Sequence, residues 1–126
     1  MKQILKFTDK SGKYQVSECN TNNVIFSLAQ MIAHHTRNGC PLETGNLIAT
    51  GTISGQPLKE RGCFFEMTQN GTVSYEMESE SQSGHKASRL YLEDGDTVEF
   101  TAQAKGKDGL GNVGFGACKG KVLAPN

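Results

Sequence analysis

Residues 46–67 read NLIATGTISGQPLKERGCFFEM and contain the two features around which the rest of the fold is predicted to be arranged. Apolar residues at 47–49 lead into a turn of small residues at 50–55, which predicts a central strand followed by a close backbone approach. After a polar loop, the apolar run 63–67 predicts a second strand with one carboxylate, Glu66, at its middle. Because a buried carboxylate is costly without a partner or a role, we predict that Glu66 and the turn belong to an active site.

The bulk composition indicates one β-rich globular domain. The chain has 126 residues, 36% hydrophobic and 21% charged, which is enough for a real core. Its 15 glycines predict many turns. The 13 basic and 13 acidic residues cancel, which argues against nucleic acid or an anionic membrane as the main partner. No stretch approaches the roughly 20 apolar residues of a membrane span.

The four cysteines are predicted to be free thiols. Their positions contain no Cys-x-x-Cys spacing, which argues against zinc: Cys19, Cys40, Cys63 and Cys118. The apolar run within MKQILKFTDK is too short for a signal peptide. We therefore expect a reducing compartment, the cytoplasm, and treat two disulfides as the less favoured alternative.

Residues 24–37 predict a single helix packed on the sheet. Apolar residues recur at helical spacing within it: Ile25, Leu28, Ala29 and Ile32. Asn22 or Asn23 is predicted to cap its start, and the Asn-Gly pair at 38–39 to end it. His34 and His35 are interpreted as structural, because adjacent helix residues point about 100° apart; a metal or base role is the alternative.

The remaining segments predict strands and turns. A hairpin at the sheet edge is expected from two strands, 3–8 and 14–17, around a turn at 9–13. Alternation predicts a half-buried strand at 97–104. A strand at 72–77 is predicted to pair with 63–67 across Asn70-Gly71, and 76–88 is predicted to be an exposed flexible loop. Residues 93–96 are predicted to form a solvated turn, with calcium binding as the alternative. A turn at 106–111 and a glycine-interrupted strand at 113–118 are expected to follow.

Four segments resemble the C-terminal part of the fumarylacetoacetase family. They read HHTRNGCPLETGNLIATGTISG at 34–55, GCFFEM at 62–67, YLEDGDTVEF at 91–100 and GFGACKGKVLAP at 114–125. The resemblance covers about residue 22 to the end, and it implies a mixed β-sandwich roll that is usually dimeric. It further implies hydrolysis of the C–C bond of 4-fumarylacetoacetate to fumarate and acetoacetate, the last step of tyrosine and phenylalanine breakdown.

The resemblance also implies roles for three residues. Glu66 matches the glutamate that assists a catalytic histidine in activating water, and Thr52, with Gly51 beside it, matches the substrate-contacting position. In the family a divalent metal, Mg²⁺ or Ca²⁺, polarises the diketone and holds the developing enolate.

The family's metal ligands and catalytic histidine lie upstream of the matching segments. None of the histidines His34, His35 and His85 falls at the catalytic position. We therefore expect residues 1–126 to be an incomplete hydrolase domain (a fragment, a truncated product or a degenerate copy) that holds no metal ligands, is inactive alone, and forms homo-oligomers. The alternative is a non-catalytic β-domain that acts as a binding or assembly module.

Overall fold

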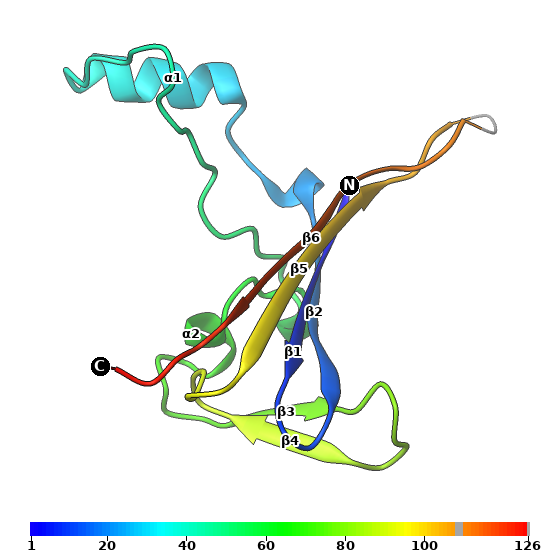
Figure 1. Ribbon diagram of the computed structural model, residues 1–126. Coiled ribbons are helices and arrows are strands. Elements are labelled where there is room, and N and C mark those ends of the chain that lie inside the picture. Colours follow the sequence, from blue (N-terminus) through cyan, green and yellow to red (C-terminus); the bar gives the residue numbers. More distant parts are fainter. Residues whose placement is uncertain (108–109, 126) are drawn as a thin grey trace.

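The computed structural model describes residues 1–107 and 110–125, which form two antiparallel sheets, one longer helix and several short helical turns (Figure 1). The mainly-β architecture predicted from the sequence is confirmed. The four-stranded sheet has the order β2-β1-β5-β6, and its strands are β1 (Lys2–Thr8), β2 (Lys13–Asn20), β5 (Thr97–Ala104) and β6 (Val113–Lys121). The two-stranded sheet pairs β3 (Tyr75–Glu78) with β4 (Lys86–Arg89). The helical elements are η1 (Thr21–Asn23), α1 (Leu28–Arg37), η2 (Leu58–Glu60) and α2 (Phe64–Met67).

The first hairpin is confirmed. β1 and β2 pair antiparallel from Lys2 opposite Asn20 to Thr8 opposite Lys13. Its turn is closed by Asp9, whose carboxylate accepts hydrogen bonds from the backbone N–H groups of Ser11 (2.8 Å) and Gly12 (3.0 Å). Of the two hairpin strands, only β2 lies at an edge of the sheet, because β5 pairs with the other side of β1.

The core lies where the first hairpin faces α2 and the small sheet. Its buried members come from five elements: Leu5, Phe7, Tyr14, Val16, Phe64, Met67, Tyr75, Met77 and Ala87. The Phe7 and Tyr14 rings are fully buried, with centroids 5.7 Å apart, and Phe64 meets Phe7 edge-on at 6.5 Å. The hydroxyl of Tyr75 donates to the carbonyl of Val16 at 3.0 Å, which ties the small sheet to β2.

Helix α1 begins four residues later than the sequence pattern predicts. Ser27 is its N-cap: its hydroxyl accepts from the N–H of Gln30, and the Gln30 side chain accepts from the N–H of Ser27 at 2.8 Å. This reciprocal capping box starts the helix at Leu28, whereas the predicted caps Asn22 and Asn23 lie in η1. The predicted end is correct, because Gly39 adopts φ +82° just after Asn38.

Helix α1 does not pack on the sheets, contrary to the prediction. Figure 1 shows α1 standing away from the strands on two connecting segments, and none of its residues is buried. Its apolar face remains open: Ile25, in the segment before it, is 86% exposed and Leu28 is 66% exposed. The helical spacing of the apolar residues therefore predicted the helical conformation correctly, but it predicted their burial wrongly.

Two predicted strands in the region 46–67 are wrong. Residues 47–50 form neither strand nor helix, and 63–67 contains the helical turn α2. Within α2, the N–H of Met67 donates to the carbonyl of Cys63 at 3.2 Å. Phe64 and Met67 are buried while Phe65 is 57% exposed, because residues three apart share a helix face.

The Asn-Gly pair at 70–71 follows α2 rather than joining two strands. Gln69, Asn70 and Gly71 have φ values of 50°, 62° and 74° in succession, and the Asn70 N–H donates to the carbonyl of Phe65. This left-handed turn leads the chain away from α2. β3 therefore pairs with β4 and not with 63–67, which corrects the predicted hairpin.

The predicted loop at 76–88 contains most of a β-hairpin. Strands β3 and β4 pair over four residues each, from Tyr75 opposite Arg89 to Glu78 opposite Lys86. Residues 79–85 alone connect them. Tyr75, Met77 and Ala87 are buried, and this short alternation with polar residues holds the hairpin on the core.

The second half of the large sheet is close to prediction. β5 has the predicted bounds and pairs with β1 and β6. β6 extends to Lys121, beyond the predicted end, and every one of its residues is exposed. The predicted turn at 106–111 includes Asp108 and Gly109, which lie outside the described residues.

Two further sequence predictions concern the whole chain. All four cysteines are free thiols, as predicted, with Cys19 buried and Cys40 and Cys118 exposed. Within residues 1–107 and 110–125, no helix has the length and apolar character needed to cross a membrane.

Candidate active site

The carboxylate of Glu66 is the centre of the candidate site, and it is anchored through one oxygen. Oε2 accepts a hydrogen bond from the hydroxyl of Ser54 at 2.5 Å and another from the backbone N–H of Gly62 at 3.2 Å. The thiol of Cys63 lies 3.6 Å from the same oxygen. The carboxylate that looked unpartnered in the sequence therefore has three partners, and all of them come from residues 54–63.

A short loop brings Ser54 to this position. The N–H of Gly55 donates to the carbonyl of Glu60 at 2.9 Å, which closes the segment containing η2 and returns the chain beside Ser54. The Ser54 hydroxyl oxygen then accepts the N–H of Gly62 at 3.1 Å. The residues of this site were predicted to lie on two strands. They lie instead on the loop that contains η2 and on the helical turn α2.

Thr52 is brought against the same glycine. A Cβ on Gly62 would overlap the methyl carbon of Thr52 and the carbonyl oxygen of Ile53, so only a hydrogen fits between these groups. Thr52 itself is exposed, and Gly51 before it adopts φ +73° with open space around it. The turn predicted to contact a ligand and the carboxylate of Glu66 thus both lie against Gly62.

The hydrogen bonds keep Glu66 ionised. The hydroxyl of Ser54 is the main cause that lowers the pKa of Glu66 below that of an ordinary glutamate, working against partial burial, which raises it. The N–H of Gly62, the Cys63 thiol and the positive charge of Arg61 lower that pKa further. Glu66 is therefore an anion at neutral pH and acts as a hydrogen-bond acceptor.

An apolar cavity of about 380 Å³ opens beside this carboxylate site. Gly62 and Cys63 line the cavity and also contact Glu66, so the two features share a wall. The other lining residues come mostly from the large sheet and the segment after β4: Leu5, Lys6, Phe7, Val16, Phe64, Tyr91, Leu92, Val98 and Phe100.

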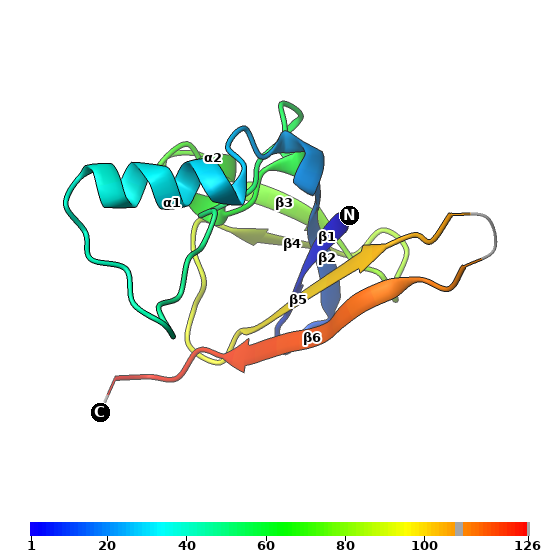
Figure 2. The ribbon, with the colours of Figure 1, turned by 90° about the horizontal axis from the view of Figure 1, so that it is seen from above.

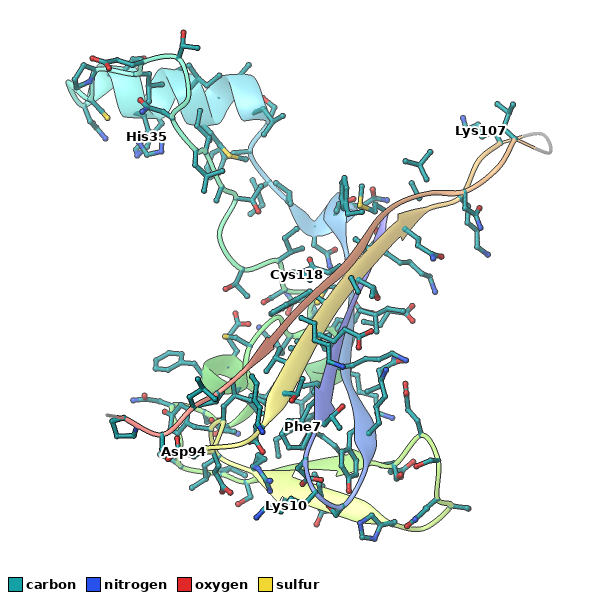
Figure 3. All side chains as sticks on the ribbon, in the orientation of Figure 1. Phe7, Lys10, His35, Asp94, Lys107 and Cys118 are labelled. Atoms are coloured by element: carbon teal, nitrogen blue, oxygen red, sulfur yellow. The ribbon has the colours of Figure 1, made fainter. Side chains whose placement is uncertain are left out.

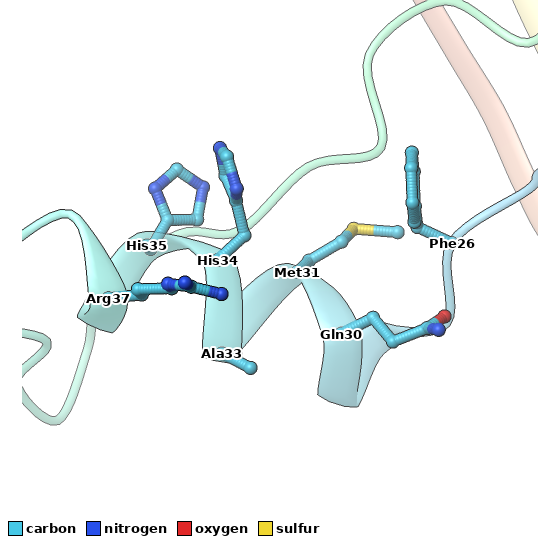
Figure 4. A pocket seen from close by; sticks show the side chains of 7 residues that line it. All are labelled: Phe26, Gln30, Met31, Ala33, His34, His35 and Arg37. Carbon is cyan, nitrogen blue, oxygen red and sulfur yellow. The ribbon is translucent and has the colours of Figure 1, made fainter.

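The histidines lie elsewhere. His34 and His35 are exposed side by side on α1 (Figure 4), and Figure 3 shows His35 far from the sheets. The side-chain amide of Asn38 lies 3.3 Å from Nε2 of His34. They line a hollow of about 540 Å³ whose lining residues all come from the segment Phe26 to Arg37. His85 packs against the ring of Tyr14 at a centroid distance of 6.3 Å. In the described part of the chain, no histidine is hydrogen-bonded to Glu66.

The described residues do not assemble a metal site. Among residues 1–107 and 110–125, no three His, Cys, Asp or Glu side chains are placed to hold one ion. The predicted turn at 93–96 is present, since the N–H of Asp96 donates to the carbonyl of Glu93 at 3.0 Å. Asp96 is 3% exposed and paired with Arg89, so it is a buried structural carboxylate rather than a solvated one.

By comparison with known proteins, this mainly-β chain belongs to the fumarylacetoacetate hydrolase family. Residues 5–123 match the family described as fumarylacetoacetate (FAA) hydrolase C-terminal. Among named relatives, the chain is 43% identical over 119 residues to fumarylacetoacetase of Oryza sativa subsp. japonica and 40% identical over 119 residues to that of Arabidopsis thaliana. It is 37% identical over 119 residues to fumarylacetoacetase of Bos taurus. Each match covers 94% of this chain and 26% of the relative, so the chain spans about a quarter of the relatives' length.

The sequence reasoning missed the residues that hold Glu66. Ser54 stood within the small-residue turn but was assigned no partner, and Gly62 and Cys63 were assigned no role at the site. The signal was the spacing of Cys63 and Glu66, three residues apart, which places both on one face if the segment is helical. Interpreting 63–67 as a strand put these two side chains on opposite faces.

Proposed function

We propose that this chain forms one wall of the active site of a C–C bond hydrolase that cleaves 4-fumarylacetoacetate to fumarate and acetoacetate. Its membership of the family and the names of its relatives support the reaction class. The observation that carries the proposal is the ionised carboxylate of Glu66, held by Ser54 and Gly62 next to Thr52.

In this proposal Glu66 orients a base. Hydrolysis of a β-diketone requires an activated water to attack a carbonyl carbon, and a neutral imidazole is a suitable base near neutral pH. A carboxylate that accepts the second ring N–H of the imidazole selects the tautomer that can take a proton from water. We assign this orienting role to Glu66. The histidine that it orients is assigned to a portion of the hydrolase outside the described residues.

Thr52 and Gly51 are assigned to substrate contact. Both are exposed, and the positive φ of Gly51 allows the backbone of the turn to approach a small ligand closely. The Thr52 hydroxyl can donate to a carboxylate or carbonyl oxygen of the substrate. The contact between Thr52 and Gly62 places this turn beside the carboxylate site.

A divalent metal, Mg²⁺ or Ca²⁺, is part of the proposed hydrolase but not of the chemistry assigned to this chain. The described residues do not fit a metal centre, because no three ligand side chains gather, and Oε2 of Glu66 is already occupied by three donors. The ligands of the metal are assigned to another part of the hydrolase.

We further propose that the chain alone is inactive and self-associates. Apolar side chains on β6 and near α1 are open to solvent, including Phe115, which is 76% exposed, and Ile25. The four free thiols support a cytoplasmic location. The second candidate function, an assembly module without catalysis, is favoured by the same exposed surfaces.

A complementation experiment tests these proposals. The chain is mixed with the separately produced segment of rice fumarylacetoacetase that precedes the matched region, and consumption of fumarylacetoacetate is measured. Activity that needs both pieces, needs added Mg²⁺ or Ca²⁺, and is lost in Glu66→Gln supports the hydrolase. Association of the two pieces without activity supports the assembly module instead. Turnover by the chain alone would contradict the proposed inactivity.

A further inference from the structure

We infer that Ser54 is a positioning residue, which anchors one oxygen of Glu66 so that only the other is presented to the catalytic base. The inference rests on the proposed role of Glu66 in the hydrolase. Ser54 contacts no reacting atom in this scheme. It acts through the carboxylate.

The direction of the Ser54 hydrogen bond follows from its neighbours. The hydroxyl oxygen accepts the N–H of Gly62 at 3.1 Å, and its own proton is then donated to Oε2 of Glu66 at 2.5 Å. A carboxylate has no proton to donate at neutral pH, so this contact runs one way only. The N–H of Gly62 is shared with Oε2 at 3.2 Å, which closes a ring of three groups.

The other oxygen of Glu66 is free. Oε1 receives no hydrogen bond from the residues that the structure describes, whereas Oε2 receives three. In the same residues, the one fully buried side-chain nitrogen or oxygen without a partner is Nε2 of His85, so Oε1 is not fully buried. The carboxylate therefore has an anchored oxygen and a presented oxygen, which is the arrangement needed to hold an imidazole N–H in one orientation.

Ser54 is the strongest of the three anchors. Its contact is the shortest, and a hydroxyl bonded to a carboxylate is a charge-assisted hydrogen bond. The Cys63 thiol is a weak donor at 3.6 Å, and the Gly62 N–H is divided between two acceptors. Thr52 and Ser54 belong to one short segment, and both contact Gly62. The same contacts therefore fix the positions of the proposed substrate turn and of the Glu66 carboxylate.

The test is a carboxyl titration of the full chain by NMR with ¹³C-labelled glutamate. In Ser54→Ala the pKa of Glu66 is expected to rise toward the ordinary glutamate value of about 4.3. Thr50→Ala is the matched control, because it removes a neighbouring exposed hydroxyl whose hydrogen bond goes to the carbonyl of Gly51. It is expected to leave the Glu66 titration unchanged. A Glu66 pKa that is the same in Ser54→Ala and in the unsubstituted chain overturns the inference.

A second variant covers the case in which Ser54→Ala does not fold. Ser54→Cys keeps a similar shape with a weaker donor, so its Glu66 pKa is expected to lie above that of the unsubstituted chain. An unchanged value in this variant also overturns the inference. The amide spectrum of β1, β2 and β5 reports whether each variant is folded.

The titration needs no turnover, so it separates this inference from the proposed function. If the complementation experiment shows no hydrolase activity while Ser54→Ala still raises the Glu66 pKa, the hydrolase assignment fails and the anchoring contact stands. If the reconstituted hydrolase is active, Ser54→Ala is expected to lower kcat about tenfold with little change in KM. An equal kcat in Ser54→Ala and in the unsubstituted chain would show that Ser54 is not a positioning residue.

Discussion

The guanidinium carbon of Arg89 lies 5.0 Å from the centroid of the Phe7 ring, so a cation from the small sheet covers a fully buried aromatic ring of the large one. The same guanidinium pairs with Asp9 at 3.0 Å and with Asp96 at 3.4 Å. These contacts join the turn of the first hairpin, the end of β4 and the start of β5. Arg89 thus ties these three segments of the chain to the core at Phe7.

Replacing Arg89 is expected to destabilise the domain strongly. Arg89→Met removes the cationic partner of Asp96, a residue that is 3% exposed, and leaves this buried carboxylate with the backbone N–H of Glu93 but no opposite charge. We expect a loss of about 3 kcal/mol in the free energy of unfolding, measured by urea denaturation. The matched control is Lys86→Met on the same strand, where the pair with Glu76 is exposed and screened by solvent, so a much smaller loss is expected. Equal losses in the two variants would contradict this account.

Replacing Gly62 is expected to distort the site. In Gly62→Ala the new methyl group overlaps Thr52 and the carbonyl of Ile53, so the segment must move away from Glu66 at a cost of about 1–3 kcal/mol. The amide shifts of residues 52–54 and 66 are expected to change together. Gly120→Ala on β6 is the control, because a Cβ there meets open space. Unchanged shifts at Ser54 and Glu66 in Gly62→Ala would refute the close contact.

The stability of the domain is expected to fall at acid pH in part because of Glu66. The Ser54 hydroxyl lowers the folded-state pKa of Glu66, so its stabilising effect is complete above the unfolded-state pKa of about 4.3 and is lost as pH falls through the folded-state value. Urea denaturation between pH 7 and pH 3 should show a smaller acid loss in Glu66→Gln. The control is Glu43→Gln, an exposed position in the segment after α1. An identical pH profile for Glu66→Gln and the unsubstituted chain would count against an ionised, anchored Glu66.

Removing the cap of α1 is expected to unfold the helix without unfolding the sheets. Ser27→Ala deletes one half of the capping box, which is worth about 1 kcal/mol. Because no residue of α1 is buried, this loss acts locally. Amide hydrogen exchange should accelerate in residues 31–37 and stay unchanged in β1 and β5. Faster exchange throughout both sheets would show that the helix is coupled to the core after all.

Self-association is expected to depend on β6. This strand lies at the edge of the large sheet, and its Val113 and Phe115 are 67% and 76% exposed. Phe115→Lys should reduce the mass measured by light scattering, while Val73→Lys, at an exposed apolar residue before β3, should not. A monomeric unsubstituted chain would contradict the proposed oligomer.

Elements with a long, regular pattern were predicted well from sequence. The alternation along Thr97–Ala104 predicted β5 with its observed bounds, and the Asp-Lys-Ser-Gly turn predicted the first hairpin. Short segments were predicted poorly. An apolar run of five residues such as 63–67 fits a strand or a helix equally well, and the helix formed because it buries Phe64 and Met67 together. A strand was predicted at 72–77, but β4 was missed because Ala87, its one buried residue, lies between Lys86 and Ser88.

The amino-acid sequence by itself determined the β-rich composition, the periods of β5 and α1, and the family to which residues 5–123 belong. These properties depend on residue types at close spacing, which the chain carries locally. The tertiary structure alone decided that Ser54 meets Glu66 across 12 residues and that Arg89 reaches Asp9 across 80. It also left α1 exposed, although its apolar period predicted burial. Such contacts depend on which distant segments share the core, and that is set by the burial of the whole chain rather than by any one stretch of it.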